Sequence, residues 1–439
     1  MDEWCEAVKI LENIAKRYPQ TAYYGLAVSL QNEWQHICRT VPHVGELMGP
    51  LEEALCSFLS TLLDVPLGED GELRRLLSHK VKQAGMGILI PTESAEVAFA
   101  TSTAASEMLV NALRQGLDLD IEEHQRTVQR ARKKAIKERV RKESEECDRQ
   151  VENADKREEN RIQRAKASGG WLTCVPTHLS GTVLSREEFT DNVRYRNGFE
   201  PTNLPEFCDG CGARFTTEHG LNCKKGGLVN ERHDDVADEW AYLGSLAFAP
   251  SAISHKPMVN EGNPRGRGNG GANNNNNGDA EDAAEPVVET DLEADKGIRN
   301  FWKHGSECLF DIRVTNTECR THRNKDPLKC LEGQEKDKKR KYETACHEQR
   351  KHFSPLVYSI DGMAGPMTRA AEKRMASRLA WKWKREYSEM CGYVRCRMSI
   401  AVVRSNSLMW RGSRTRRRAH PGFIDSGGAM DAWQTVGEM

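Results

Sequence analysis

The N-terminal part of the chain has its apolar residues at helical spacing. The segments WCEAVKILENIAKRY, YYGLAVSLQNEWQHICRTV and PLEEALCSFLSTLL each gather them on one helical face, and prolines mark the boundaries. Residues 1–117 are therefore predicted to form a small all-helical module. We expect no chemistry there, because the histidines of this module have no matching ligands nearby in the sequence.

The pattern changes to a strongly charged stretch over residues 118–168, which lacks proline and glycine until its end. Its few apolar residues are too small and too sparse to form a coiled-coil seam. One long solvated helix is predicted. Its cations from Arg130 to Lys142 either lie along a nucleic-acid backbone or pair with acids three or four positions away on the same helix.

A connecting segment follows at residues 169–225, opened by Gly169 and Gly170, which break the charged helix. WLTCVP and GTVL suggest two short strands. Ser185, with Glu188 three residues later, predicts a capping box at the start of a helix.

Four candidate metal ligands lie at the end of this segment. Cys208, Cys211, His219 and Cys223 form the pattern C-x2-C-x7-H-x3-C, with glycines between them that favour tight turns. Three thiolates and one imidazole satisfy a tetrahedral Zn²⁺ ion, whereas the alternative is a set of ordinary buried cysteines. Because four protein ligands leave no coordination position for a substrate, we expect a structural zinc that clamps the helical module onto the segment that follows.

Residues 226–410 combine helical and strand-like periodicity, which predicts an α/β core. The predicted elements are amphipathic helices at 228–246 and 367–385 and strands at 298–303, at 308–315 and in LVYSID. In the strand at 308–315, alternation sends Phe310 and Ile312 to one face and Asp311 to the other. Trp381, on the last helix, is expected to lie in the core rather than to serve as a platform for stacked bases.

Two segments lack the apolar residues that a core needs. Residues 259–294, rich in Asn and Gly, are predicted to be a disordered insertion within the α/β core. Residues 411–439 begin with RGSRTRRRAHPG, a basic cluster suited to phosphate contact or nuclear import at the start of a flexible tail.

Composition narrows the functional classes. The chain has 439 residues, 38% hydrophobic and 29% charged, with a net charge of -1, so contact with nucleic acid has to come from local basic patches. No apolar run is long enough to span a bilayer and the N-terminus does not follow the pattern of a signal peptide, so we expect a soluble, intracellular protein without a membrane partner. The scattered cysteines outside the zinc pattern favour reduced thiols over a disulfide framework.

The zinc pattern, followed by GGLVNERHDDVADEW, ADKGIRNFWKHGSECLFDIRVTNT and LEGQEKDKKRKYETACHEQRKHF, resembles the C-terminal half of non-LTR (LINE-type) retrotransposon polyproteins that carry a restriction-like endonuclease. AYYGLAVSLQNEWQHICR and HKVKQAGMGILIP are similar to the reverse-transcriptase thumb and connection of that family. The resemblance implies an α+β multidomain chain that ends in a restriction-endonuclease-like, PD-(D/E)XK core. The polymerase palm is missing from this chain.

The resemblance also implies site residues. Asp295 and Asp311 stand where the family binds catalytic Mg²⁺ or Mn²⁺, and Arg232 and His233 stand at its Arg-His pair. Lys338 stands in the K-x-x-K-Y signature as the lysine that assists water, with Lys341 as the alternative. The chain departs from the family's pattern in two places: Ala294 replaces the usual Pro or Gly before the first Asp, and Asn316 replaces a frequent Asp after the strand that carries Asp311. Arg313 stands where restriction enzymes usually have lysine, and the resemblance implies that this lysine has moved to the following helix.

Three of these assignments have competitors in the sequence itself. Asp295 follows an acidic stretch in which Asp291 and Glu293 are the competing choices for the first ligand. Glu239 is a candidate third metal ligand, with Asp238 as the competing choice. Arg232 either forks onto phosphate oxygens or pairs with Asp235 or Asp238 on its own helix.

The function implied by the resemblance is metal-dependent nicking of target DNA, which in complete elements frees a 3'-hydroxyl for reverse transcription. The expected partners are the DNA target and, as a further candidate, the element's RNA, with a nuclear location. The main alternative is a noncatalytic, zinc-containing nucleic-acid-binding remnant. A structural adaptor organised by the charged helix is the third hypothesis. The sequence leaves the target site and the oligomeric state open.

Overall fold

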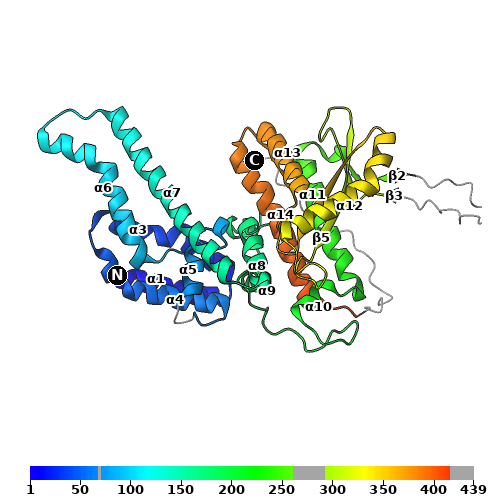
Figure 1. The fold of residues 1–439 in the computed structure, drawn as a ribbon, viewed down its shortest axis with the longest axis horizontal. Coiled ribbons are helices and arrows are strands. Elements are labelled where there is room, and N and C mark those ends of the chain that lie inside the picture. The colour runs from blue at the N-terminus through cyan, green and yellow to red at the C-terminus, as the bar shows by residue number, and fades with distance from the viewer. Residues whose placement is uncertain (68–70, 261–291, 416–439) are drawn as a thin grey trace, which may run out of the picture.

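The computed structural model describes residues 1–67, 71–260 and 292–415 (Figure 1). A helical body formed by the N-terminal part lies beside a block that contains a β-sheet and is formed by the C-terminal part. Most of the predicted insertion and most of the predicted tail, at 261–291 and 416–439, lie outside the described residues.

The N-terminal body is all-helical, as predicted. Its core is built around large apolar side chains that are fully buried, among them Trp34, Phe58 and Leu55. The helices are α1 (Asp2–Ala15), α2 (Pro19–Tyr24), the π-helix η1 (Gly25–Leu30), α3 (Gln31–Thr40), η2 (Val44–Leu47), α4 (Gly49–Leu63), α5 (Glu72–Ser78), η3 (Val81–Gln83) and α6 (Pro91–Gln115).

The charged stretch forms two helices, so the prediction of one long helix is wrong. Helix α7 (Ile121–Asn153) projects with α6 as a hairpin from the helical body, and α8 (Lys156–Ala167) lies between the two bodies (Figure 1). The chain breaks because Asp155 caps α8, its carboxylate accepting a hydrogen bond from the backbone N–H of Glu158 at 2.8 Å.

The cations of α7 are only partly neutralised. Arg141 pairs with Glu138 and Glu145, which fits the expectation of pairing within the helix. Among the described residues, no ion pair involves four exposed cations nearer the N-terminus of α7: Arg132, Lys133, Lys134 and Lys137.

The connecting segment has no strand at WLTCVP or GTVL, so these two predictions are wrong. The first forms the 3-10 helix η4 (Gly170–Thr173), which buries Trp171 and Leu172 in the N-terminal core. Cys174 then forms a disulfide with Cys396, against the expectation of reduced thiols, while the other twelve cysteines are free. The predicted capping box of Ser185 and Glu188 is confirmed at the start of α9 (Arg186–Arg196).

The C-terminal block is built on a mixed sheet of four strands in the order β1-β4-β5-β6. Strand β5 is antiparallel to β4 and parallel to β6. A separate pair, β2 and β3, joins the two ends of the insertion. The strands are β1 (Ile253–His255), β2 (Met258–Asn260), β3 (Leu292–Glu293), β4 (Lys296–Arg299), β5 (Glu307–Thr315) and β6 (His352–Ser359).

Helices cover both faces of this sheet. Phe310 and Ile312 pack with α11, α13 and α14 on one face, whereas Leu309 packs with Tyr342 of α12 on the other. The alternation predicted for β5 is therefore confirmed, and Asp311 lies on the α12 face. The helices of this block are α10 (Thr217–Asn222), η5 (Lys225–Gly227), α11 (Leu228–Ala247), η6 (Pro250–Ala252), α12 (Pro327–Glu348), α13 (Pro366–Trp383) and α14 (Tyr387–Arg411).

Helix α14 connects the two bodies. Ile400 and Val403 belong to the N-terminal core, whereas Met398 and Val402 pack against the sheet. The N-terminal core is therefore continuous with the C-terminal block rather than separated from it by a linker. None of the helices in the described parts of the chain has the length and apolar character needed to cross a bilayer.

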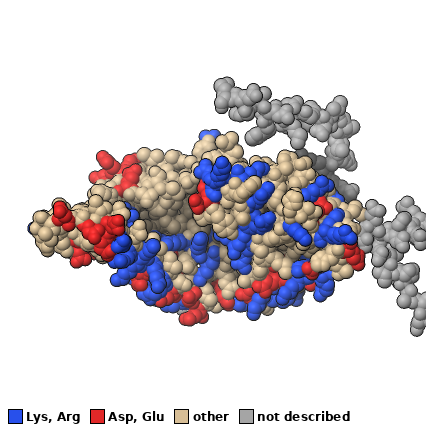
Figure 2. Space-filling view, turned by 90° about the horizontal axis from the view of Figure 1, so that it is seen from above, with Lys and Arg blue, Asp and Glu red and all other residues tan. Residues whose placement is uncertain are grey.

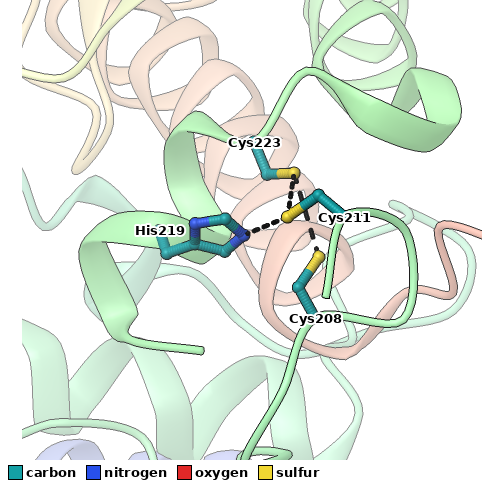
Figure 3. Close-up of side chains that lie close together, drawn as sticks. All are labelled: Cys208, Cys211, His219 and Cys223. Carbon is teal, nitrogen blue, oxygen red and sulfur yellow. Dashed lines mark hydrogen bonds between the residues drawn. The ribbon is translucent and has the colours of Figure 1, made fainter. Parts of the chain in front are cut away.

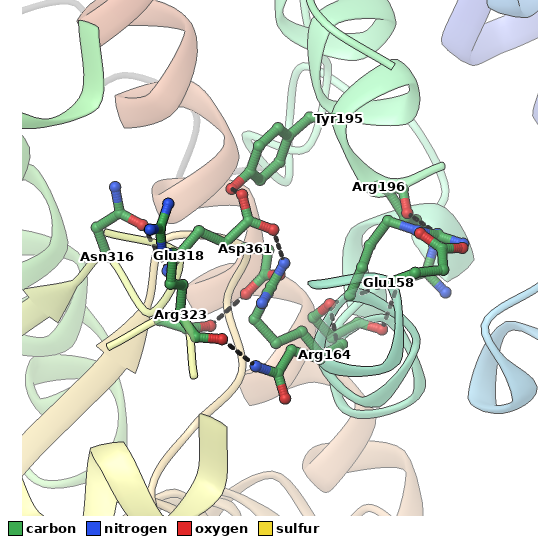
Figure 4. Close-up of polar contacts among 12 residues, drawn as sticks. Glu158, Arg164, Tyr195, Arg196, Asn316, Glu318, Arg323 and Asp361 are labelled. Carbon is green, nitrogen blue, oxygen red and sulfur yellow. Dashed lines mark hydrogen bonds and ion pairs between the residues drawn. The ribbon is translucent and has the colours of Figure 1, made fainter. Parts of the chain in front are cut away.

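A buried charge cluster fixes α8 against the loops that follow β5 and β6 (Figure 4). Arg164, 1% exposed, forms ion pairs with Glu318 and with Asp361, the latter at 2.6 Å. The Tyr195 hydroxyl donates to Glu318 at 2.8 Å. Burial alone would lower the pKa of Arg164, but the two carboxylates raise it, so the guanidinium stays charged.

Arg164→Met is expected to lower the free energy of unfolding by about 3–5 kcal/mol, because it leaves two carboxylates buried without their cation. Lys166→Met is the control: Lys166 pairs with Asp148 at 3.4 Å on the surface of the same helix, and its loss should cost under about 1 kcal/mol. Urea unfolding measures both. Equal losses would contradict the assigned role of Arg164.

Glu372 of α13 makes stability dependent on pH. It is buried and accepts a hydrogen bond from the Tyr358 hydroxyl at 2.9 Å, and burial raises its pKa to about 7. Because the raised pKa favours the protonated folded state, this contribution is complete below about pH 4.5 and is lost as the pH rises through 7. Glu372→Gln should therefore stabilise the protein by about 3 kcal/mol at pH 8 and by little at pH 4.5. Thermal or urea unfolding at the two pH values tests this, and an equal effect at both would contradict it.

Candidate functional site

The four predicted zinc ligands converge (Figure 3). Their ligand atoms all lie within 4.8 Å of one another. The Sγ atom of Cys223 is 3.9 Å from those of Cys208 and Cys211, and the Sγ of Cys211 is 3.4 Å from Nε2 of His219. Two thiolates bound to one tetrahedral zinc at about 2.3 Å stand about 3.8 Å apart, so this arrangement fits the ion without rearrangement.

Local turns bring these ligands together. The backbone N–H of Gly212, which has a φ of 72°, donates to the carbonyl of Cys208 at 2.8 Å and closes the first turn. Thr216 caps α10 by accepting from the N–H of His219, and Cys223 follows the end of that helix. Both halves of the ligand set therefore come from short, hydrogen-bonded turns.

Electrostatics favour a thiolate at Cys208. Burial alone would raise the pKa of this thiol, but hydrogen bonds from His219 and from the backbone N–H groups of Gly210 and Cys211 lower it to about 6. A thiolate is the form that binds a metal ion. Burial raises the pKa of Cys223, so an ion at the site would have to displace that proton.

The last residues of the described chain pack against the segment that carries the four zinc ligands. Arg414 is 3% exposed, lies over the ring of Phe215 at 5.3 Å and donates to the carbonyl of Gly220 at 2.9 Å. The Asp209 carboxylate accepts from the backbone N–H of Arg414 at 2.8 Å. A Cβ at Gly210 would lie 2.6 Å from Arg414, which explains the glycine there. The tail predicted to be flexible from residue 411 is therefore ordered and packed through residue 415.

The two candidate metal-binding aspartates lie next to each other in the sheet region, because Asp311 is in β5 and Asp295 directly precedes β4. The register pairs Lys296 with Phe310, so Asp295, one residue earlier, lies opposite Asp311. The Oδ2 atom of Asp295 accepts a hydrogen bond from the backbone N–H of Ile312 in β5 at 2.6 Å. In a regular sheet, a backbone carbonyl of the neighbouring strand would accept this hydrogen bond. The side chain of Asp295 is 24% exposed and that of Asp311 is 7% exposed, so the pair lies at the edge of the solvent-accessible surface.

His233, on the first part of α11, bridges two acids. Its Nε2 lies 3.0 Å from Oδ2 of Asp295, and its Nδ1 lies 2.9 Å from Oδ1 of Asp234. The hydrogen bond to Asp295 raises the pKa of His233 to about 9, so the imidazole is protonated at neutral pH. Burial alone would raise the pKa of Asp295, but His233, the N–H of Ile312 and Lys338 lower it and keep it ionised.

Lys338 of α12 completes this cluster. Its Nζ forms an ion pair with Oδ2 of Asp311. Lys341 lies one turn further along the same helix, where its Nζ is 3.2 Å from the hydroxyl of Tyr342, and that hydroxyl donates to the carbonyl of Glu293. Burial is the main cause of the raised pKa of Tyr342, and the negative charges of Asp311 and Asp295 raise this pKa further. Tyr342 therefore lies close to both aspartates.

Two predicted site residues lie elsewhere. Arg232 is 5% exposed and donates to the carbonyl of Leu221 at 3.1 Å, which ties α11 to α10 in the zinc segment rather than to a phosphate or to an acid of its own helix. Glu239 pairs with Arg397 of α14 at 2.8 Å. Its competitor Asp238 pairs with Lys296 at 2.6 Å. Among the described residues, the only group of three or more convergent His, Cys, Asp or Glu ligands is the zinc set, so neither acid joins Asp295 and Asp311.

Neither the scan of family models nor the comparison with curated proteins finds a match for this chain.

Proposed function

We propose that this protein is a metal-dependent DNA endonuclease, derived from a retrotransposon polyprotein, that nicks a target strand. The observation that carries the proposal is the convergence of Asp295, Asp311 and Lys338 across β4, β5 and α12. Asp295 and Asp311 are far apart in the sequence and come close only because β4 pairs with β5. Their proximity therefore supports a shared role.

The donor set fits a hard divalent cation. Carboxylate oxygens are the ligands that Mg²⁺ and Mn²⁺ prefer, and Mg²⁺ commonly binds one or two carboxylates together with substrate phosphates. Asp295 and Asp311 would hold such an ion, which when bound neutralises phosphate charge and lowers the pKa of the attacking water. No third protein ligand is required.

The chain's own residues have separate roles. Lys338 holds the Asp311 carboxylate in place and presents an ammonium next to the position where a phosphate would lie. His233 fixes the orientation of Asp295 through one nitrogen, while Asp234 fixes His233 through the other. Arg232 and Glu239 support the zinc segment and α14 and are not assigned to the reaction.

Two basic surfaces suit a phosphate backbone. An open pocket of about 500 Å³ is lined by Lys303, His304, His347 and Arg350, where β5 and β6 begin. It lies roughly 10–13 Å along β5 from Asp311. The four unpaired cations of α7 form a second basic surface. Such patches account for DNA contact by a chain whose net charge is only -1.

Nicking of supercoiled plasmid DNA tests this function. Relaxed circles should accumulate with Mg²⁺ or Mn²⁺ and should not form when EDTA is present. DNA retention without any metal-dependent nicking would overturn the proposal.

A second candidate, a noncatalytic zinc-containing nucleic-acid-binding remnant, has one observation in its favour. Both acids are already neutralised by protein cations, Asp295 by His233 and Asp311 by Lys338. Such pairs also occur in cores that bind no metal, and the plasmid assay separates the two candidates.

A further inference from the structure

The corner between α13 and α14 exposes an unusual run of side chains. All residues of the segment WKWKREY, from Trp381 to Tyr387, are exposed, with Trp381 at 70%, Trp383 at 38% and Tyr387 at 47%. The expectation that Trp381 lies in the core is therefore wrong. The buried face of α13 carries Met375 and Leu379, and Trp381 lies two positions beyond Leu379, which turns it to the opposite side of the helix.

Cations are interleaved with these rings. The guanidinium of Arg378 lies 4.4 Å from the centre of the Trp381 ring, within the range of a cation–π contact. Lys382 donates to the carbonyl of Leu246 at 2.7 Å and so fastens the corner to the end of α11. Lys384 adopts a left-handed φ of 54° where α13 ends. Figure 2, which looks onto the upper side of the molecule in Figure 1, shows Lys and Arg side chains gathered across this side.

The exposed aromatic surface continues onto α11. Trp383 meets Tyr393 edge to face at 5.6 Å, and Arg397 lies over the 47%-exposed ring of Tyr242 at 4.9 Å. Tyr393 and Arg397 lie one turn apart on α14, so Trp383, Tyr393 and Tyr242 follow one another from α13 across α14 to α11. We call Tyr242, Arg378 and residues 381–387 the aromatic corner.

We propose that the aromatic corner binds single-stranded nucleic acid, with unpaired bases stacking on Trp381 and Trp383 and with phosphates contacting the interleaved cations. Exposed aromatic rings combined with positive charge are the features that bind single strands regardless of sequence. Bases in a duplex are already stacked on each other and cannot use these rings. The cations favour a polyanion over an apolar protein partner.

The aromatic corner is separate from the acid cluster. Leu246, where Lys382 is fastened, lies thirteen residues along α11 from His233, which corresponds to about 20 Å of helix. Binding of a single strand at the aromatic corner therefore does not depend on the proposed nuclease activity.

Fluorescence anisotropy with a labelled oligothymidylate tests this proposal. Trp381→Ala should weaken binding by about 5- to 100-fold, whereas Trp381→Phe, which retains a stacking ring, should stay within about 3-fold of the wild type. Tyr18→Ala is the matched control, since Tyr18 is 55% exposed under Arg17 on the helical body, and it should change nothing.

An abasic oligomer of equal length separates base stacking from phosphate contact. It should bind the wild type and Trp381→Ala equally. The proposal is overturned if the wild type does not bind oligothymidylate, as expected for a protein-docking surface, or if Trp381→Ala binds it as tightly as the wild type. Asp311→Asn should leave this affinity unchanged, so loss of nicking and loss of single-strand binding are distinguishable outcomes.

Discussion

Removing the metal from the Cys208, Cys211, His219 and Cys223 site is expected to unfold the segment from residue 206 to 225 and to release Arg414. A structural zinc contributes on the order of 10–16 kcal/mol in isolated zinc-finger peptides at neutral pH, far more than the small apolar cluster of this segment can supply. Arg414 packs against this segment through Phe215, Gly220 and Asp209. The protection of Arg414 from hydrogen exchange should therefore disappear together with that of the zinc ligands.

Hydrogen exchange before and after chelation measures this effect. One equivalent of zinc per chain should be released by a chromophoric chelator, and exchange should rise in residues 206–225 and 412–415. Cys208→Ser should reproduce the change, whereas Cys319→Ser should not, because Cys319 is a free cysteine whose Sγ lies next to the Thr321 hydroxyl, outside the zinc segment. Unchanged exchange after complete metal removal would contradict a zinc clamp.

Asp311→Asn is expected to reduce the nicking rate by about 10³-fold or more, the scale on which groups that hold a catalytic metal or stabilise transition-state charge contribute. The amide keeps the shape of the side chain but removes the charge that pairs with Lys338 and attracts a cation. Lys338→Met should have a smaller effect of about 10²-fold, since it removes one cation and leaves both carboxylates.

Local patterns in the sequence predicted much of the candidate site. The spacing of Cys208, Cys211, His219 and Cys223 and the strand alternation at Asp311 each depend on residues near one another in the chain. The capping box at Ser185 is local in the same sense. These features could be predicted because few distant contacts can override them.

The incorrect expectations depended on tertiary contacts. Trp171 is apolar enough for a strand but is buried in a 3-10 turn by the neighbouring helical core. Arg232 lies next to His233 in sequence, yet it turns toward the carbonyl of Leu221 because the zinc segment packs there. Glu239 forms an ion pair with Arg397 of α14, which lies more than 150 residues later in the chain, and this pair occupies its carboxylate. None of these contacts has a local signature.

Two features of the site were missed for a related reason. Asp234 was not predicted as a site residue, although a His followed directly by an Asp could have suggested an oriented imidazole. The backbone N–H of Ile312, which holds Asp295, carries no side-chain signal at all. It becomes visible only once the register of β4 and β5 is known.

Plasmid nicking and DNA binding, measured together for the wild type, Asp311→Asn and Asp337→Asn, test whether Asp311 holds a catalytic metal ion. Asp337 precedes Lys338 on the exposed side of α12 and pairs only with Arg340 among the described ion pairs, so it controls for loss of an acid on the same helix. We expect Mg²⁺-dependent nicking by the wild type and Asp337→Asn, and no detectable nicking by Asp311→Asn at unchanged DNA affinity. Equal nicking by all three proteins, or no nicking by any of them, would contradict it.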